Sequence, residues 1–370
     1  MGKQKNARPS LTIQKRLDHC RAELRERGMP AYLITSRMDQ VYLTGFDGED
    51  GAAVITSRGL HIITDGRFEE AFRLQIPWAQ RHLRRNSLAE AVAKVCRKLR
   101  LSELHFQPDD VTVQVNAALR KACRPTRLTG APPIVNHMRR IKDRSEMKKL
   151  RQAISIAEAA FKAAKRKIKI GMTEIEIAAL LEFEMKNRGA LGPSFPTIVA
   201  EGKNAALPHA EPGRRVVRKG SLILIDWGAI NDYYCSDLTR VLFVGRIPPR
   251  LAEVYRIVLE AQQKAIKSIA PGKRVCDVDE VAREYITQKG YGAQFGHGLG
   301  HGIGLDIHED PRIKFGFTDR LEAGMVVTIE PGIYLPGIGG VRIEDDVLVT
   351  ARGHEVLTHL PKSLASAVIQ

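Results

Sequence analysis

Two aspartates occupy what the sequence predicts to be a single β-hairpin. Asp226 ends the apolar run 222–225, and Asp237 follows eleven residues later. If the chain reverses at Asn231 and Asp232, a favourable two-residue turn, the aspartates become direct cross-strand neighbours. Their Cβ atoms would then lie roughly 5 Å apart. The spacing therefore predicts two carboxylates that face each other.

A second pair of carboxylates, Glu330 and Glu344, flanks a later hairpin whose turn we centre on Gly337. Like charges opposite one another destabilise a sheet, and burying them unpaired costs more. A cation between them reverses that effect, and carboxylate oxygens suit hard divalent ions. The other interpretation is that each acid is exposed or paired with Arg240, Arg342 or a lysine. Two facing pairs favour a site for two divalent ions.

A histidine cluster lies between the two hairpins in the sequence. Residues 295–312 read FGHGLGHGIGLDIHEDPR, with glycine at alternate positions from 296 to 304. In an extended chain His297 and His301 would share one face, and the glycines opposite would let another backbone approach closely. His308 follows seven residues after His301. The segment is not an H-E-x-x-H zinc motif, because Arg312 stands where the second histidine would be.

His209 is a further candidate. It lies in NAALPHAEPG, a loop rich in small residues and proline. We assign no role to the other histidines, which are His19, His61, His82, His105, His137, His354 and His359.

The elements that position these residues follow from hydrophobic periodicity and turn signals. The first part of the chain alternates helices and strands and is predicted to be an α/β domain. Helices are expected at 14–28 and at 88–99, the latter capped by Ser87. Strands are expected at 31–36, 51–57, 60–64 and 103–106.

The second part repeats a pattern of helices followed by hairpins. A long helix should start after Ser145, without a capping box because Lys148 stands three residues on. The next helix has such a box, formed by Thr173 and Glu176. Later helices fit 250–268 and 277–290, and strand pairs fit 221–230 with 233–244 and 324–334 with 340–350. The pattern predicts two similar halves, with domains at 1–138 and 139–370.

Charge and cysteine content limit the class of protein. The net charge is +16, and residues 1–150 hold 29 Lys and Arg against 16 Asp and Glu. This excess indicates either a solvated basic face or a surface that contacts nucleic acid or another polyanion. Five scattered cysteines form no C-x-x-C, which is typical of reduced thiols, and we expect a cytoplasmic protein. No run of 18 apolar residues or signal peptide is evident, so no membrane partner is expected.

In order, the chain contains NAALPH, DWGA with YCSDLTR, GHGIGLDIHEDP, TIEPGIY and GVRIED. These motifs closely resemble the pita-bread metallopeptidases of the proline-specific branch, which comprises Xaa-Pro aminopeptidase and Xaa-Pro dipeptidase (prolidase). The resemblance covers about 145–355, and a looser likeness to a creatinase-type N-terminal domain rests on VYLTGF and TDGRF within 16–75. It implies an α/β (α+β) pita-bread catalytic domain with pseudo-two-fold halves, preceded by a smaller creatinase-like domain.

The resemblance also implies a ligand set for two divalent ions. Asp226 would bind one ion, Asp237 and Glu344 would bridge both, and His301 and Glu330 would bind the other. Manganese is the expected metal, with cobalt, zinc or iron as other options.

The implied reaction is hydrolysis of the peptide bond before proline. Glu330 would act as general base, His308 would donate to the oxyanion, and His209 or His297 would move a proton to the proline nitrogen. His209 and His308 would also contact the substrate. Arg312 and Arg320 are candidates for holding its carboxylate. Arg342 is a candidate both for supporting the strands that carry the ligands and for contacting the substrate. A homodimer or higher homo-oligomer is expected.

Three alternatives stay open from the sequence. Methionine aminopeptidases share the catalytic fold but lack the creatinase-like domain. Other carbon–nitrogen hydrolases use the same two-domain scaffold. Some relatives are non-catalytic binding proteins, for which the basic first domain would suit a polyanion.

Overall fold

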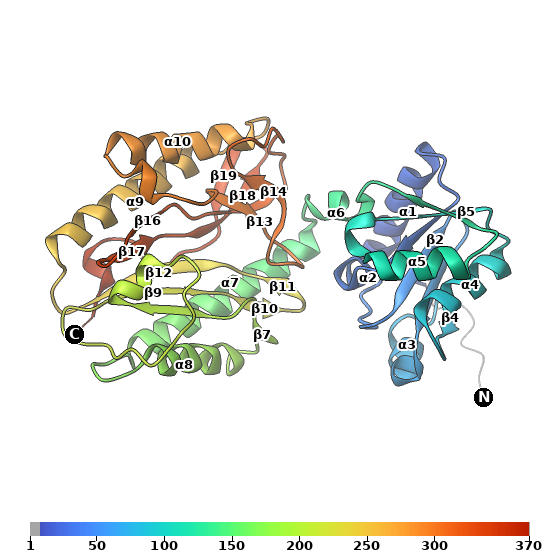
Figure 1. The fold of residues 1–370 in the computed structure, drawn as a ribbon, viewed down its shortest axis with the longest axis horizontal. Helices are drawn as coiled ribbons and strands as arrows, with labels where there is room; N and C mark the ends of the chain where they lie inside the picture. The colour runs from blue at the N-terminus through green and yellow to red at the C-terminus, as the bar shows by residue number, and fades with distance from the viewer. Residues whose placement is uncertain (1–7, 370) are drawn as a thin grey trace. The chain divides into compact units, whose positions relative to one another are not determined.

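The computed structural model describes residues 8–369, and the chain divides into two compact units between Arg139 and Arg140 (Figure 1). The first unit contains one six-stranded sheet in the order β4-β3-β2-β1-β5-β6. Its strands are β1 (Ala31–Ile34), β2 (Ala52–Thr56), β3 (Leu60–Thr64), β4 (Gln80–Leu83), β5 (Glu103–Phe106) and β6 (Arg127–Gly130). The four strands predicted for this part of the chain are confirmed as β1, β2, β3 and β5.

Helices cover this sheet on both faces. They are α1 (Leu11–Glu26), α2 (Arg37–Thr44), α3 (Glu69–Gln75), α4 (Leu88–Leu99), α5 (Val113–Ala122) and α6 (Ile134–Arg139), with short 3-10 turns η1 (Gly66–Phe68) and η2 (Pro108–Asp110). The predicted cap is confirmed, because Ser87 Oγ accepts a hydrogen bond from the backbone N–H of Glu90 at 3.2 Å. Only β2 runs antiparallel to its neighbours. The sheet is therefore an α/β arrangement, as predicted.

Part of the basic excess gathers at one edge of this sheet. Because α4 and α5 both lead from one parallel strand to another, their C-terminal ends lie at the same edge. Arg97 and Lys98 on α4 and Arg120 and Lys121 on α5 are exposed there. A solvated basic face and contact with a polyanion both stay open as interpretations of this excess.

The second unit is built from helix pairs and antiparallel strands. Its helices are α7 (Arg144–Lys165), α8 (Glu174–Lys186), α9 (Pro249–Ser268) and α10 (Val275–Gln288), with η3 (Gly202–Ala206), η4 (Gly292–Gln294) and η5 (Ala365–Ala367). The strands of the first half and the C-terminal strand are β7 (Gly192–Pro193), β8 (Ile198–Glu201), β9 (Leu222–Trp227), β10 (Ala229–Asn231), β11 (Tyr234–Cys235), β12 (Leu238–Val244) and β20 (Val368–Ile369). Those of the second half are β13 (Gly300–Gly302), β14 (Glu309–Ile313), β15 (Val326–Ile329), β16 (Gly332–Leu335), β17 (Gly339–Arg342), β18 (Asp345–Thr350) and β19 (Gly353–Val356).

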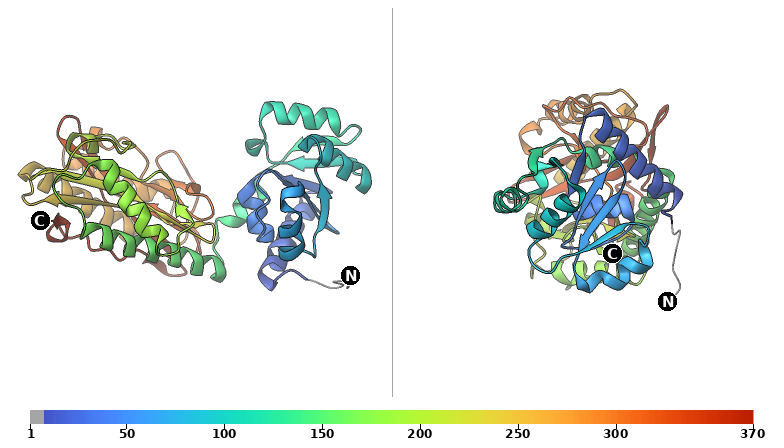
Figure 2. Two further views of the ribbon diagram at one scale, coloured as in Figure 1. Left: turned by 90° about the horizontal axis from the view of Figure 1, so that it is seen from below. Right: turned by 90° about the vertical axis from the view of Figure 1, so that its right-hand side faces the viewer.

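Two similar halves result, as the sequence predicts. One half places α7 and α8 against the sheet β20-β12-β9-β8, and the other combines α9 and α10 with the sheet β14-β13-β15-β18-β19. Two smaller sheets have the orders β11-β10-β7 and β16-β17. Figure 1 shows α9 and α10 along one face of the strands and α7 and α8 along the opposite face. The view from below in Figure 2 places the α7 and α8 pair in front of the strands.

Strand β9 shows how side-chain alternation positions a site residue. Ile225 and Trp227 point into the core under α7 and α8, whereas Leu224 joins the core under α9 and α10. Trp227 stacks on Phe161 at 4.4 Å between ring centroids. Truncating a buried aromatic of this kind costs about 3–5 kcal/mol. Because successive side chains point to opposite faces, Asp226 is directed into the space between the two layers.

The start of α7 differs from the prediction. The N-cap is Asp143, whose carboxylate accepts from the N–H groups of Ser145 and Glu146 at 2.7 and 3.0 Å. The Glu146 carboxylate in turn accepts a hydrogen bond from the N–H of Asp143, so a capping box does form. The prediction was wrong because it placed the cap at Ser145 and overlooked an acceptor two residues earlier.

The register of the first hairpin also corrects the sequence interpretation. The turn lies at Asp232 and Tyr233, both with positive φ (49° and 69°), rather than at Asn231 and Asp232. Asp226 therefore faces Thr239, and Asp237 lies diagonally across from it. The second hairpin has the predicted register, since Ile329 pairs with Asp345 and Gly332 with Arg342.

Candidate metal centre

A cavity of about 490 Å³ opens within the second unit. Every site residue predicted from the sequence lines it except Arg320, which donates instead to the backbone of Gly272. The predicted residues along its wall are His209, Asp226, Asp237, His297, His301, His308, Arg312, Glu330, Arg342 and Glu344. They come from β9, β13, β14, β17 and the segments beside them, so the fold brings together residues that span 136 positions of the sequence.

Three buried side chains form the centre of the site. Ligand atoms of Asp237, His301 and Glu344 all lie within 4.8 Å of one another. The His301 Nε2 atom lies 3.6 Å from Asp237 Oδ2 and 3.5 Å from Glu330 Oε1. The other ring nitrogen, Nδ1, lies 3.0 Å from the carbonyl oxygen of Gly302, to which it donates when it carries the proton. That tautomer leaves the lone pair of Nε2 directed at the carboxylates, as a metal ligand requires.

Asp226 joins the centre from the opposite strand. Its Oδ2 atom accepts from Arg342 Nη2 at 2.6 Å, whereas Oδ1 is buried and has no hydrogen-bond partner within residues 8–369. A buried carboxylate oxygen without a donor is costly unless a cation satisfies it. Asp226 therefore offers one free ligand atom at the cavity wall.

The electrostatics of the site favour a cation. Burial and the neighbouring carboxylates raise the pKa of Asp237 and of Glu344 well above the ordinary values. Burial likewise raises the pKa of Glu330 to about 8, although Arg342 opposes the shift. Four acidic groups thus line one cavity, where Arg342 pairs with Asp226 and Arg312 lies in the same wall. Divalent ions would supply the missing positive charge, and the oxygen-rich donor set with one imidazole fits them.

The contacts of Arg342 bear on its two predicted roles, support of the ligand strands and contact with the substrate. Besides Asp226, its guanidinium donates to Thr239 Oγ1 (3.1 Å), the Pro208 carbonyl (3.2 Å) and the Tyr334 hydroxyl (2.8 Å). The side chain is only 4% exposed. Its donors are used to hold the walls of the cavity, so the contacts favour a positioning role.

The remaining histidines surround the carboxylates. His308 packs edge-on against His301 with ring centroids 4.4 Å apart. His297 has both ring nitrogens engaged, one with the Gly298 carbonyl at 2.7 Å and the other with the Tyr334 hydroxyl at 2.9 Å. Burial lowers the pKa of His308, and it lowers the pKa of His297 and of His301 to about 4. These rings are therefore neutral near pH 7.

Glycines allow the strand that carries His301 to lie close to its neighbours. A Cβ on Gly300 would meet the Thr328 carbonyl oxygen at 1.9 Å, and one on Gly302 would meet that of Asp310 at 2.3 Å. The predicted close approach of another backbone is confirmed.

His209 is positioned by a residue that the sequence analysis overlooked. Glu174, at the start of α8, is fully buried and accepts from the N–H groups of Glu201 (2.7 Å) and Gly213 (2.9 Å). It also accepts from the side-chain amide of Asn204 at 2.9 Å. These bonds fix the loop on both sides of His209. The sequence signal was slight, because a glutamate in the first turn of a helix is ordinarily explained by the helix dipole.

Thr239 and Tyr334 are two further site residues without a predicted role. Thr239 Oγ1 donates to Glu344 Oε2 at 2.7 Å, and Tyr334 connects Arg342 with His297. The correct hairpin register would have placed Thr239 opposite Asp226. Tyr334 was visible only as part of the motif TIEPGIY.

Comparison with known proteins identifies the family. The profile of metallopeptidase family M24 matches residues 148–351, which is more than half of the chain. The chain belongs to metallopeptidase family M24. The creatinase/prolidase N-terminal domain matches residues 16–141. The predicted family and the pita-bread fold with a creatinase-like first domain are thereby confirmed.

Individual proteins match over nearly the whole chain. The uncharacterized peptidase YqhT of Bacillus subtilis (strain 168) is 37% identical over 349 residues, covering 94% of this chain and 99% of that protein. The structure of an Xaa-Pro dipeptidase from Bacillus anthracis has a TM-score of 0.92 at 39% identity, covering 96% of this chain and 100% of that one. An X-Pro aminopeptidase from Thermotoga maritima MSB8 has a TM-score of 0.86 at 39% identity, covering 93% and 99%.

These findings establish a peptidase of the M24 type with a group of residues suited to divalent metal. Within residues 8–369, no helix combines the length and the apolar character needed to cross a bilayer.

Proposed function

We propose that this M24 chain is an Xaa-Pro peptidase. It would hydrolyse the bond between an N-terminal residue and proline, in dipeptides or at the start of longer peptides. The proposal rests chiefly on the convergence of the predicted carboxylates and His301 on one cavity. The likeness to an Xaa-Pro dipeptidase and to an X-Pro aminopeptidase supports the choice of substrate.

The metal ligands would be Asp226, Asp237, His301, Glu330 and Glu344. Manganese is our proposed metal, although this donor set also accepts cobalt, zinc or iron. When bound, two such ions supply Lewis acidity that activates water and polarises a carbonyl group.

The chain's own residues then have distinct tasks. Glu330 is partly buried at the cavity wall, and its raised pKa suits a group that accepts a proton from water. His308 is neutral and can donate an N–H to the oxygen of the carbonyl under attack. His209 faces the cavity and makes no hydrogen bond within residues 8–369, so it is free to deliver a proton to the proline nitrogen. His297 is less suited, because Gly298 and Tyr334 occupy both of its ring nitrogens.

Arg312 is the proposed partner of the substrate carboxylate. It lies opposite His301 in the β13–β14 pairing, lines the cavity and forms no ion pair within the described residues. Lys314, two residues further, lines the same wall. A free arginine at this position matches a dipeptide, whose carboxylate lies close to the scissile bond.

The deciding experiment compares Ala-Pro, Ala-Pro-Ala and Ala-Ala-Ala as substrates of the metal-stripped protein, with and without Mn²⁺. Cleavage of Ala-Pro alone identifies a dipeptidase, whereas release of Ala from Ala-Pro-Ala identifies an aminopeptidase. Absence of Mn²⁺-dependent cleavage of both proline peptides would refute the proposal. Replacing Arg312 with Met should raise the KM for Ala-Pro more than tenfold and leave the KM for the Ala-Pro amide unchanged. Light scattering would test the homodimer that we also propose.

A further inference from the structure

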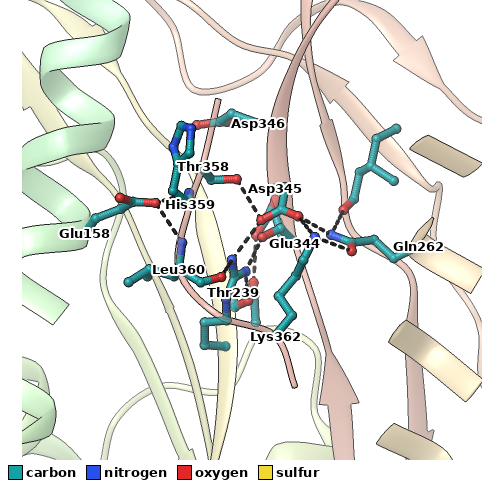
Figure 3. A network of polar contacts seen from close by, with 12 residues as sticks. Glu158, Thr239, Gln262, Glu344, Asp345, Asp346, Thr358, His359, Leu360 and Lys362 are labelled. Carbon is teal, nitrogen blue, oxygen red and sulfur yellow. Dashed lines mark hydrogen bonds and ion pairs between the residues drawn. The ribbon is translucent and has the colours of Figure 1, made fainter. Parts of the chain in front are cut away.

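A second buried carboxylate, Asp345, directly follows Glu344 but does not line the cavity. Its side chain is fully buried and accepts four hydrogen bonds. Arg240 Nη2 (2.8 Å) and Thr358 Oγ1 (2.7 Å) donate to Oδ1. Gln262 Nε2 (2.9 Å) and Lys362 Nζ donate to Oδ2. Figure 3 shows Gln262 of α9 and Thr358 and Lys362 of the segment after β19 converging on Asp345.

The arginine of this cluster also holds Glu344. Arg240 Nη1 donates to the Glu344 carbonyl at 2.5 Å and to the Thr239 carbonyl at 2.9 Å. The next residue along β12, Thr239, donates through its hydroxyl to Glu344 Oε2 at 2.7 Å. The backbone and the side chain of Glu344 are therefore both fixed by β12. Asp345 holds the guanidinium of Arg240 together with the Leu360 carbonyl, which accepts from Nη2 at 3.1 Å.

The second cation of the cluster comes from a segment outside the M24 match, which ends at residue 351. Lys362 lies in the C-terminal segment that follows β19. Its Nζ atom also donates to Gln262 Oε1 at 3.0 Å, and its carbonyl accepts from the Tyr255 hydroxyl at 3.1 Å. The side chain is 21% exposed and does not reach the cavity.

These contacts form a continuous chain from the C-terminal segment to the metal centre. A buried carboxylate that loses one of its two cations is left to interact with the other cation alone, and it moves toward it. This movement would shift Arg240 and, with it, the backbone of Glu344. A small displacement of a ligand is enough to weaken metal binding. Mutating a residue that hydrogen-bonds to a metal ligand commonly lowers the affinity for the metal 10- to 100-fold.

We propose that Lys362 is a positioning residue of the metal centre, acting on Glu344 through Asp345 and Arg240. The proposal depends on the proposed role of Glu344 as a metal ligand. It assigns to the C-terminal segment a task in metal binding that the family match does not cover.

The test measures the apparent Kd for Mn²⁺ by competition with a fluorescent chelator, in the full-length metal-stripped protein. Lys362→Met should raise this Kd at least tenfold, whereas Lys362→Arg, which keeps a cation, should stay within threefold of wild type. Thr358→Val removes a weaker donor from the same carboxylate and should raise the Kd about threefold. It also provides a milder perturbation if Lys362→Met does not fold, as judged by circular dichroism. The KM for Ala-Pro should not change in any of these variants.

Lys165→Met is the matched control. Lys165 Nζ donates to the carbonyl of Ser366 and so fastens the same C-terminal segment without touching Asp345. Its Kd for Mn²⁺ should equal that of wild type. An unchanged Kd in Lys362→Met, or an equal rise in Lys165→Met, would overturn the proposal. Failure of the wild-type protein to bind Mn²⁺ would instead refute the metal centre itself, and the role of Lys362 with it.

Discussion

Replacing Arg342 with Met separates its two predicted roles, support of the ligand strands and contact with the substrate. Methionine retains much of the apolar length of arginine but donates no hydrogen bond. The change removes the hydrogen bonds to Asp226, Thr239, Pro208 and Tyr334. All four partners belong to the protein, and none requires a substrate.

The expected loss of stability follows from Asp226. Its Oδ1 atom already lacks a hydrogen-bond partner within residues 8–369, so the variant would leave the whole carboxylate without a donor in a buried position. Breaking a buried ion pair by removing one partner costs about 3–5 kcal/mol. We expect the low end, about 3 kcal/mol, because Asp226 borders a cavity that water can enter. Mn²⁺ should restore part of this loss, since a cation then satisfies the carboxylate.

The assay is urea unfolding followed by circular dichroism, with chelator and with Mn²⁺, alongside the kinetics of Ala-Pro hydrolysis. Arg342→Met should lower the free energy of unfolding and kcat while the KM changes little. Arg342→Lys keeps the positive charge but not the several N–H donors of the planar guanidinium, so its free energy of unfolding should lie between those of wild type and Arg342→Met. A stability within about 0.5 kcal/mol of wild type, combined with a tenfold higher KM, would refute the positioning role. It would restore the role in substrate binding that the sequence suggested.

Three further predictions test other parts of the molecule. Asp237→Asn should remove at least one bound metal, measured by elemental analysis, and nearly all hydrolysis of Ala-Pro. Circular dichroism should show that the fold is intact. Wild-type activity in the metal-loaded variant would refute the role of Asp237 as a metal ligand. Glu174→Ala leaves buried N–H groups without an acceptor, so it should lower the free energy of unfolding by about 2–4 kcal/mol. It should also reduce kcat, because the loop that carries His209 becomes less rigid. An unchanged urea midpoint would contradict this. In the first unit, burial lowers the pKa of His61 and lowers that of His82 to about 4. The unfolded chain takes up protons near pH 6.5 and the folded histidine pair does not, so the free energy of unfolding should fall as the pH drops from about 6.5 to 4. His82→Gln should flatten this pH dependence, measured as Tm against pH. An equally steep profile in the variant would rule out the pair as its source.

The sequence by itself determined the second hairpin and its glutamates. A strand alternates its side chains with a period of two, and a short turn fixes which residues face each other. Centring the turn on Gly337 was therefore enough to obtain the observed register of β15–β18 and β16–β17. The family followed from ordered motifs, which are local strings that survive without any knowledge of the fold.

The first hairpin shows where local rules stop. Its turn places Tyr233, a bulky residue, at a positive φ of 69°, which sequence preferences for such turns do not select. The strands around it are packed on both faces, and this packing decided the register against the local preference. The resulting shift of two residues hid the pairing of Asp226 with Thr239.

Only the tertiary structure decided which residues share the site. His209 and Arg342 are far apart in the sequence, yet they line one cavity because Glu174 fixes one loop and β17 carries the other residue. The sequence did not show which charged residues form ion pairs either, because it gives no sign of whether an arginine binds a substrate, pairs with Asp226 or lies in solvent. Local periodicity encodes elements and registers, whereas long-range contacts depend on how two layers pack, and the metal centre lies between those layers.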